Sequence, residues 1–217
     1  MRVLVTGGSA CGKSTFAESL AAQLPQPRYY LATMRPLDDE LLAKIARHRE
    51  MRRTKGFESL EHDVDVANVR IAEKATVLLE CLCNLTANEL FDATGAIDEA
   101  AYGRILDDIA SLEKRCANLI VVTNDIGSGT TGAYDDSTRF YVETLGKLNA
   151  VLASRFDRVY ELVCGIPLLL KDESLESAWL ESRQPEDAWP EDEPRAGRQP
   201  DDEPNRRPTI SREKEQV

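Results

Sequence analysis

The feature that most constrains this chain is the run GGSACGKST at positions 7–15. It has the spacing G-x-x-x-x-G-K-S, in which Gly12, Lys13 and Ser14 follow Gly7 after four intervening residues. Glycines let backbone amides close around phosphate oxygens, and the lysine and serine side chains suit phosphate and Mg²⁺. The alternative is a glycine-rich turn that carries a surface lysine.

The segments on both sides of this run favour a phosphate-binding loop. Residues 2–6 are β-branched and apolar, as expected of a buried parallel strand. After the run, Phe16, Leu20 and Leu24 recur at helical spacing. Strand, loop and helix therefore come in the required order. The sequence predicts a nucleotide site that includes Gly7, Gly8, Ser9, Ala10, Cys11, Gly12, Lys13 and Ser14.

Composition narrows the class of protein. The chain has 217 residues, of which 42% are hydrophobic, and this is enough for a domain with its own core. Its net charge of -11 argues against a nucleic-acid partner. Five cysteines without a C-x-x-C pair indicate reduced thiols. The sequence shows neither a signal peptide nor a membrane-length apolar run, so we expect a cytoplasmic protein that does not enter membranes.

The composition changes near Lys171. Six of the ten prolines lie between Lys171 and Val217, with repeated acidic runs such as PEDEP. A segment of this kind does not bury enough apolar surface to offset the entropy of ordering it. We therefore predict a catalytic domain over 1–171 and a mostly disordered acidic tail over 172–217.

The catalytic part alternates predicted strands and helices. The strands are expected at 2–6, 28–33, 76–80, 118–124 and 158–164. The helices are expected at 14–24, 38–53, 65–74, 98–116 and 137–156, with Asp38 and Ser137 as N-caps. This alternation predicts a three-layer α/β fold with a mostly parallel sheet. Ligands bind beyond the carboxyl ends of such strands, where Thr33, Glu80 and Asn124 fall.

A basic cluster surrounds one of the two histidines. Six lysines and arginines lie within 44–55, on both sides of His48. A local excess of positive charge suits a nucleoside triphosphate. Like charges also oppose protonation of the imidazole, which predicts a lowered pKa for His48 and a neutral, nucleophilic ring. The residues by themselves favour the alternative, a solvated helix face with an incidental histidine.

Two further segments end in polar residues at strand ends. Glu80 closes the apolar run TVLLE, where P-loop enzymes commonly place an acid that organises magnesium. The run VVTNDIGSG at 121–129 places Asn124 and Asp125 before a glycine-rich turn. This second run differs from the N-K-x-D guanine signature of GTPases.

Together these segments resemble the bifunctional adenosylcobinamide kinase/adenosylcobinamide-phosphate guanylyltransferase family of cobalamin biosynthesis. The resemblance covers about 1–171. It rests on VLVTGGSACGKS, the ATM of 32–34, the H-R-E-x-R of 48–52, the LLEC of 78–81, VTNDIGSG, and the final VCGIPLLLK. Asp125 stands where family members have a glutamate, and Ala10-Cys11 replaces an arginine-serine pair.

The resemblance implies two reactions and a set of residues. A kinase step phosphorylates adenosylcobinamide with ATP or GTP, and a transferase step attaches GMP from GTP through a guanylylated histidine, here His48. Mg²⁺ is implied at Ser14, and a homotrimer is implied as the assembly. Besides Lys13 and residues 7–14, the implied nucleotide site contains Ala32, Thr33, Met34, Arg49, Glu50, Met51, Arg52, Glu61 and Glu80. The sequence leaves open whether Glu80 contacts guanine or organises Mg²⁺.

Two other functions stay open on the residues alone. One is a P-loop kinase for another small alcohol or nucleoside, in which His48 is inert. The other is a nucleotide-binding regulatory module whose acidic tail recruits a partner.

Overall fold

The computed structural model describes residues 1–35, 55–126 and 134–175. These residues form a seven-stranded sheet in the order β3-β2-β4-β5-β1-β6-β7. Neighbouring strands from β3 to β6 pair in parallel, and β7 pairs antiparallel with β6. The strands are β1 Arg2–Gly7, β2 Arg28–Ala32, β3 Phe57–Glu61, β4 Thr76–Glu80, β5 Asn118–Val122, β6 Arg158–Val163 and β7 Ile166–Asp172.

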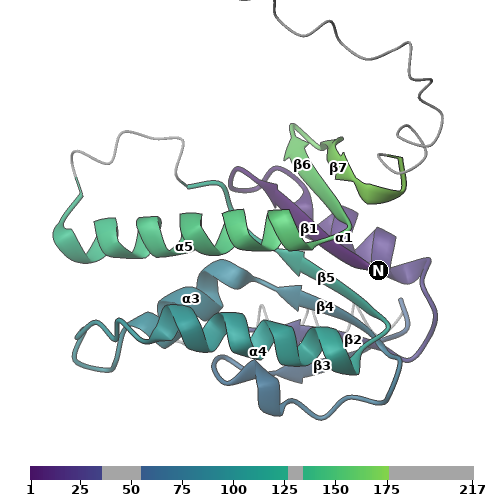
Figure 1. The fold of residues 1–217 in the computed structure, drawn as a ribbon. Coiled ribbons are helices and arrows are strands. Elements are labelled where there is room, and N and C mark those ends of the chain that lie inside the picture. The colour runs from purple at the N-terminus through teal and green to yellow at the C-terminus, as the bar shows by residue number, and fades with distance from the viewer. Residues whose placement is uncertain (36–54, 127–133, 176–217) are drawn as a thin grey trace, which may run out of the picture.

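Helices cover both faces of this sheet, which makes three layers (Figure 1). One face is covered by α1 and the other by α3, α4 and α5. The helices are α1 Lys13–Ala22, α3 Leu82–Leu90, α4 Ala101–Arg115 and α5 Asp136–Arg155, with a short 3₁₀ turn, η1, at Val66–Asn68. The predicted α/β class with a mostly parallel sheet is confirmed.

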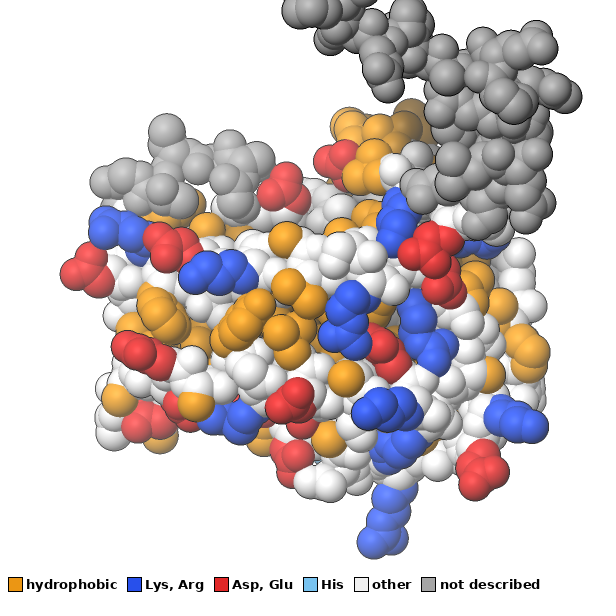
Figure 2. Space-filling view, in the orientation of Figure 1, with side chains coloured by type: hydrophobic (Ala, Val, Ile, Leu, Met, Phe, Trp, Pro, Cys, Tyr) orange, Lys and Arg blue, Asp and Glu red, His pale blue; other side chains and the backbone are white. Residues whose placement is uncertain are grey.

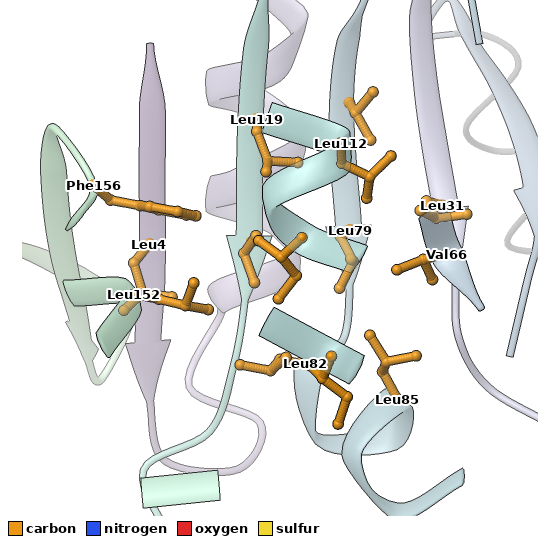
Figure 3. Close-up of a cluster of buried hydrophobic side chains, with 14 of the residues drawn as sticks. Leu4, Leu31, Val66, Leu79, Leu82, Leu85, Leu112, Leu119, Leu152 and Phe156 are labelled. Carbon is orange, nitrogen blue, oxygen red and sulfur yellow. The ribbon is translucent and has the colours of Figure 1, made fainter. Parts of the chain in front are cut away.

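The core divides between the two faces because side chains alternate along each strand. On one face, Leu4, Leu79 and Leu119 pack against leucines of α3, α4 and α5 (Figure 3). On the other face, Val3 and Val5 meet the small side chains of α1. Each large aliphatic side chain removed from water stabilises the fold by about 2 kcal/mol. Burial on both faces explains why these strands are almost uniformly apolar.

The predicted helix over 65–74 is wrong. Only the single turn η1 forms there. The guanidinium of Arg115 donates hydrogen bonds to the carbonyls of Ala67 at 2.7 Å and Val69 at 2.9 Å. Because a side chain from α4 satisfies these carbonyls, the segment stays extended after the turn while Val66 and Val69 are buried.

The N-cap predicted at Ser137 is also wrong. Helix α5 begins at Asp136, and the cap is Asp135, whose carboxylate accepts a hydrogen bond from the Thr138 amide at 2.7 Å. Strand β3 and helix α3 were absent from the prediction. Both are short and neither has a strong apolar period, so their pairing and packing decide their structure. The predicted helix 38–53, with its cap at Asp38, lies outside the described residues.

Strand β7 differs from the other described strands because its first five residues are all exposed. Ile166 is 62% exposed and Leu170 is 59% exposed, and the leucines between them are also exposed. The strand ends at Asp172, one residue beyond the predicted limit of the catalytic domain. The predicted tail lies outside the described residues from position 176 onward.

Candidate nucleotide-binding site

The phosphate loop connects β1 to α1. Gly7 ends β1 with φ of 139°, and Gly12 caps α1 with φ of 98°. A Cβ added at Gly7 would lie 2.5 Å from the carbonyl oxygen of Leu162 in the neighbouring strand β6. The loop therefore needs glycine at position 7 for both its backbone angle and its close approach to β6.

Lys13 is held inside this loop. Its ammonium donates hydrogen bonds to the carbonyls of Gly7, at 3.0 Å, and Gly8, and it lies 3.8 Å from the Cys11 sulfur. The residue is only 7% exposed. A buried ammonium at the start of α1 adds its charge to the positive end of the helix dipole, where phosphate groups bind.

Ser14 lies beside Glu80. The Ser14 hydroxyl donates a hydrogen bond to one oxygen of the Glu80 carboxylate, and the Tyr30 hydroxyl donates to the other oxygen at 2.7 Å. Tyr30 belongs to the core cluster of the α1 face, and Glu80 shares that face because it lies two residues after Leu78 of the same cluster. Two hydrogen bonds thus hold the Glu80 carboxylate beside Ser14, which directly follows Lys13.

These oxygens suit Mg²⁺, which prefers hard oxygen ligands and retains several waters. The Ser14 hydroxyl and the Glu80 carboxylate are the candidate protein ligands. Within the described part of the chain, no group of three or more His, Cys, Asp and Glu residues converges as a metal site. A magnesium ion here would therefore also depend on phosphate oxygens and water.

Other predicted residues line up at the same edge. Ala32 pairs with Glu61 on one side and with Glu80 on the other, so the three lie in one row at the carboxyl ends of β3, β2 and β4. Thr33 is fully buried directly after this row, whereas Met34 is 43% exposed. The structure thus brings Glu61, which the resemblance implied, and Glu80, which its strand end predicted, to one edge of the sheet.

Thr33 connects this row to helix α3. Its hydroxyl donates to the Cys81 carbonyl at 2.7 Å and accepts from the Cys81 amide at 2.8 Å. The Asn88 side-chain amide donates to the carbonyls of Thr33 at 2.8 Å and Asp63 at 2.9 Å. These bonds join the ends of β2, β3 and β4 to α3, so the edge is held as one unit.

The residues that follow β5 contact both the phosphate loop and helix α3. The Asp125 amide donates to the Gly7 carbonyl at 3.2 Å, and the Asn124 amide donates to the Cys83 sulfur at 3.1 Å. A hydrogen bond from Cys81 is the main cause that lowers the pKa of Cys83 to about 7, and the Lys13 charge contributes. Cys83 thus belongs to the electrostatic surroundings of the phosphate loop.

The structure brings one part of the predicted site together and leaves another part undescribed. The loop residues 7–14 meet Glu80, and the row of Ala32, Thr33 and Glu61 lies at the same strand ends. The residues of the basic cluster from His48 to Arg52 lie outside the described residues.

Sequence reasoning missed Tyr30, Asn88 and Cys83. Tyr30 had a readable signal, since it lies two positions before Ala32 and therefore faces α1 with it. Asn88 and Cys83 had no such signal. They reach the site only because α3 packs across the strand ends.

The sheet, the glycine loop and the buried lysine define a P-loop nucleotide-binding protein. The chain belongs to the CobU family, described as cobinamide kinase / cobinamide phosphate guanyltransferase, which it matches over residues 3–170. Both family activities are transferase activities. The resemblance inferred from the motifs is thereby confirmed.

Individual relatives match the chain over most of its length. The bifunctional adenosylcobalamin biosynthesis protein CobU of Salmonella typhimurium is 33% identical over 183 residues, and that of Escherichia coli is 32% identical over 183 residues. Each alignment covers 79% of this chain and 100% of the relative. The corresponding CobP of Pseudomonas aeruginosa is 33% identical over 178 residues, which is 81% of this chain and 100% of the relative.

A solved structure, the flagellar accessory protein FlaH of Methanocaldococcus jannaschii, aligns at 13% identity with a TM-score of 0.41. The alignment covers 79% of this chain and 78% of the FlaH chain. A match at this level carries no argument about function.

Proposed function

We propose that this chain phosphorylates adenosylcobinamide and then transfers GMP from GTP to adenosylcobinamide phosphate through a guanylylated His48. The observation that carries the proposal is the contact of Ser14 with Glu80 beside the buried Lys13, in a chain that matches the family over 3–170. The three groups together provide a cation for phosphate and oxygen ligands for magnesium.

In the kinase step, the loop amides and Lys13 bind the phosphates of ATP or GTP. The γ-phosphorus–oxygen bond to the nucleoside diphosphate breaks, and a bond forms to the aminopropanol hydroxyl oxygen of the corrinoid, which loses its proton. Lys13 stabilises the charge that spreads over the transferring phosphoryl group. Bound Mg²⁺ would supply further charge neutralisation at the phosphates.

The contacts of Ser14 favour the magnesium role for Glu80. The carboxylate accepts from the Ser14 hydroxyl, which is the loop's own magnesium ligand in the motif. Tyr30 holds the second oxygen, so the carboxylate keeps one orientation. We therefore assign Glu80 to the magnesium side of the nucleotide.

In the transferase step, a nitrogen of the neutral His48 imidazole attacks the α-phosphorus of GTP, and the bond to pyrophosphate breaks. A phosphate oxygen of adenosylcobinamide phosphate then attacks the same phosphorus, which releases the histidine. The residues on either side of the segment that carries His48 are both paired: Arg35 with Asp63 at the strand ends, and Lys55 with Glu18 of α1.

Labelled GTP tests both steps separately. We expect α-labelled GTP to leave an acid-labile, base-stable label on the chain that His48→Ala abolishes. We expect γ-labelled nucleotide to label adenosylcobinamide in both proteins. Transfer of γ-label without any label from α-labelled GTP would mean a kinase in which His48 is inert. Nucleotide binding with neither transfer would mean a regulatory module.

We propose a homo-oligomer built on the β6–β7 hairpin, a trimer as the family resemblance implies. Hydrophobic side chains gather on this hairpin at the top of Figure 2. Val163, Ile166, Leu168, Leu169 and Leu170 are each more than 40% exposed. An uncovered apolar edge strand favours burial against a second copy. Light scattering with Leu170→Glu and Ile166→Glu, against Lys147→Glu on α5, tests this: only the first two are expected to dissociate the assembly.

The division into a catalytic domain over 1–171 and a tail over 172–217 is part of the proposal, and so is a cytoplasmic location. All five cysteines are free thiols, which supports a reducing compartment. Within residues 1–35, 55–126 and 134–175, no helix has the length and apolar character that a membrane crossing requires.

A further inference from the structure

A cavity of about 640 Å³ is lined by residues that follow β2 and β3, by the end of α3, by the connection to α4 and by the first half of α4. Figure 1 shows that β2 and β3 end at the same end of the sheet as β1, which leads into the phosphate loop. The described wall of the cavity includes five carboxylates and two guanidiniums, which gives a formal charge of -3. We call it the acidic pocket, and its carboxylates are Asp65, Glu89, Asp92, Asp98 and Asp108.

The two guanidiniums of the wall are already engaged. Arg104 pairs with Asp98 at 2.8 Å and with Glu89 at 3.2 Å. Arg35 pairs with Asp63, which lies outside the wall. The wall therefore keeps an excess of negative charge. Burial is the main cause that raises the pKa of Asp108, and the nearby Asp65 and Glu89 charges add to it. Such a wall attracts a cation and repels a triphosphate.

The carboxylates surround a space instead of converging on a point. No metal-binding cluster is found among the residues described, and these carboxylates belong to that set. The wall also contains apolar surface from Val64 and Phe91 and the amide of Asn88. Charge, amide and apolar surface around a large cavity suit an organic cation with polar substituents more than a bare ion.

A short chain of hydrogen bonds links the acidic pocket to the sheet edge that carries the phosphate loop. Asn88, in the pocket wall, donates to the Thr33 carbonyl at 2.8 Å. The Thr33 amide in turn donates to the Glu80 carbonyl at 3.0 Å, and Glu80 contacts Ser14. A large ligand bound in the acidic pocket would therefore lie close to the nucleotide site.

We propose that the acidic pocket receives one edge of the corrin ring of adenosylcobinamide, so that the acceptor arm extends toward the phosphate loop. This inference rests on the proposed function. The cobalt(III) corrin carries a net positive charge and is bordered by methyl groups and amide side chains. The carboxylates match the charge and can accept hydrogen bonds from the amides, and Phe91 and Val64 match the methyl groups. Because the two sites carry opposite charges, the nucleotide is not drawn into the acidic pocket and the corrin ring is not drawn into the phosphate loop.

Charge reversal in the wall provides the test. Ala93 lines the acidic pocket and is exposed, so its replacement removes no hydrogen bond. We expect Ala93→Lys to raise KM for adenosylcobinamide about 10-fold, whereas the neutral Ala93→Gln leaves it within about 2-fold. Asp65→Asn should raise KM in the same direction, and Asp107→Asn, on the adjacent exposed face of α4, should leave it unchanged.

Two further readouts separate charge from folding. Dicyanocobinamide, kept in excess cyanide, is neutral because its second cyanide cancels the charge, so Ala93→Lys should hardly change its binding by equilibrium dialysis. Labelling of each variant by α-labelled GTP alone should match that of the unmodified protein.

The outcomes distinguish the two proposals. If the unmodified protein phosphorylates adenosylcobinamide but Ala93→Lys and Asp65→Asn keep its KM, the pocket assignment is wrong and the proposed function stands. If the unmodified protein transfers no phosphoryl group to adenosylcobinamide, the proposed function fails. If Ala93→Lys weakened the binding of adenosylcobinamide and of dicyanocobinamide equally, the lysine would block the pocket sterically. That result would also overturn the charge argument.

Discussion

The phosphate loop and the acidic pocket lie at the same end of the sheet and are built in opposite ways. The loop is one short stretch of chain whose backbone amides and Lys13 provide positive charge. The pocket takes its negative wall from residues as far apart as Asp65, Glu89 and Asp108. A site for an anion can thus come from local backbone geometry, whereas the proposed site for a cation needs tertiary packing.

The largest expected effect is on the loop. Lys13→Ala should lower kcat of phosphoryl transfer about 10³-fold, because the cation that stabilises the transferring group is lost. Binding of adenosylcobinamide without nucleotide should be unchanged. Steady-state kinetics and equilibrium dialysis measure the two quantities, with Lys147→Ala on the exposed face of α5 as the matched control. Full activity of Lys13→Ala would remove the loop from the mechanism.

Gly7→Ala should destabilise the fold by about 2–4 kcal/mol, because it combines a left-handed φ with a Cβ placed 2.5 Å from the Leu162 carbonyl oxygen. Gly146→Ala is the control, since nothing lies within 4 Å of a Cβ there and the residue is inside α5. We expect that variant to be stabilised by about 0.5–1 kcal/mol. Urea unfolding measures the stability of both variants. If Gly7→Ala were as stable as the unmodified protein, the turn would have relaxed without cost.

Glu80→Gln should lower kinase kcat about 10-fold to 100-fold and raise the magnesium concentration needed for half-maximal rate. The neutral amide retains a partner for Tyr30 but weakens the oxygen ligand beside Ser14. A titration with MgCl₂ at fixed nucleotide checks this. A change in the preference between ATP and GTP, with the magnesium requirement unaltered, would instead assign Glu80 to the guanine.

A smaller effect concerns pH. The pKa of Asp108 is raised, chiefly by burial, so its carboxylate gains a proton at higher pH than an ordinary aspartate. Protonation removes negative charge from the acidic pocket. KM for adenosylcobinamide should therefore rise a few-fold as pH falls toward that raised pKa, and KM for the nucleotide should not follow it. Asp65 and Glu89 face Asp108 and contribute to its shift, so Asp108→Asn should flatten the profile without abolishing it.

The smallest expected effect comes from removing residues 176–217. The predicted tail is rich in proline and acidic residues, and both sites lie within the residues that precede it. Kinase kcat and the thermal midpoint should stay within experimental error of the full chain. A large loss of either property would overturn the proposed domain boundary.

Sequence reasoning succeeded where the signal is local. The spacing from Gly7 to Ser14, the strand that precedes it and the acid that ends TVLLE were all readable from contiguous residues. It failed over 65–74, where Arg115 from a distant helix satisfies the carbonyls that a helix would have used. It also missed β3 and α3, whose short runs form because β2 and the strand ends provide partners.

By itself, the sequence determined the α/β class, the family and the phosphate loop, because these depend on hydrophobic pattern and on backbone conformations that specific residues favour. Only the tertiary structure decided that Tyr30 and Ser14 hold opposite oxygens of Glu80, and that distant carboxylates surround one pocket. The reason is physical: contacts between residues far apart in the chain depend on how strands are ordered and helices are packed, and no local pattern specifies that order.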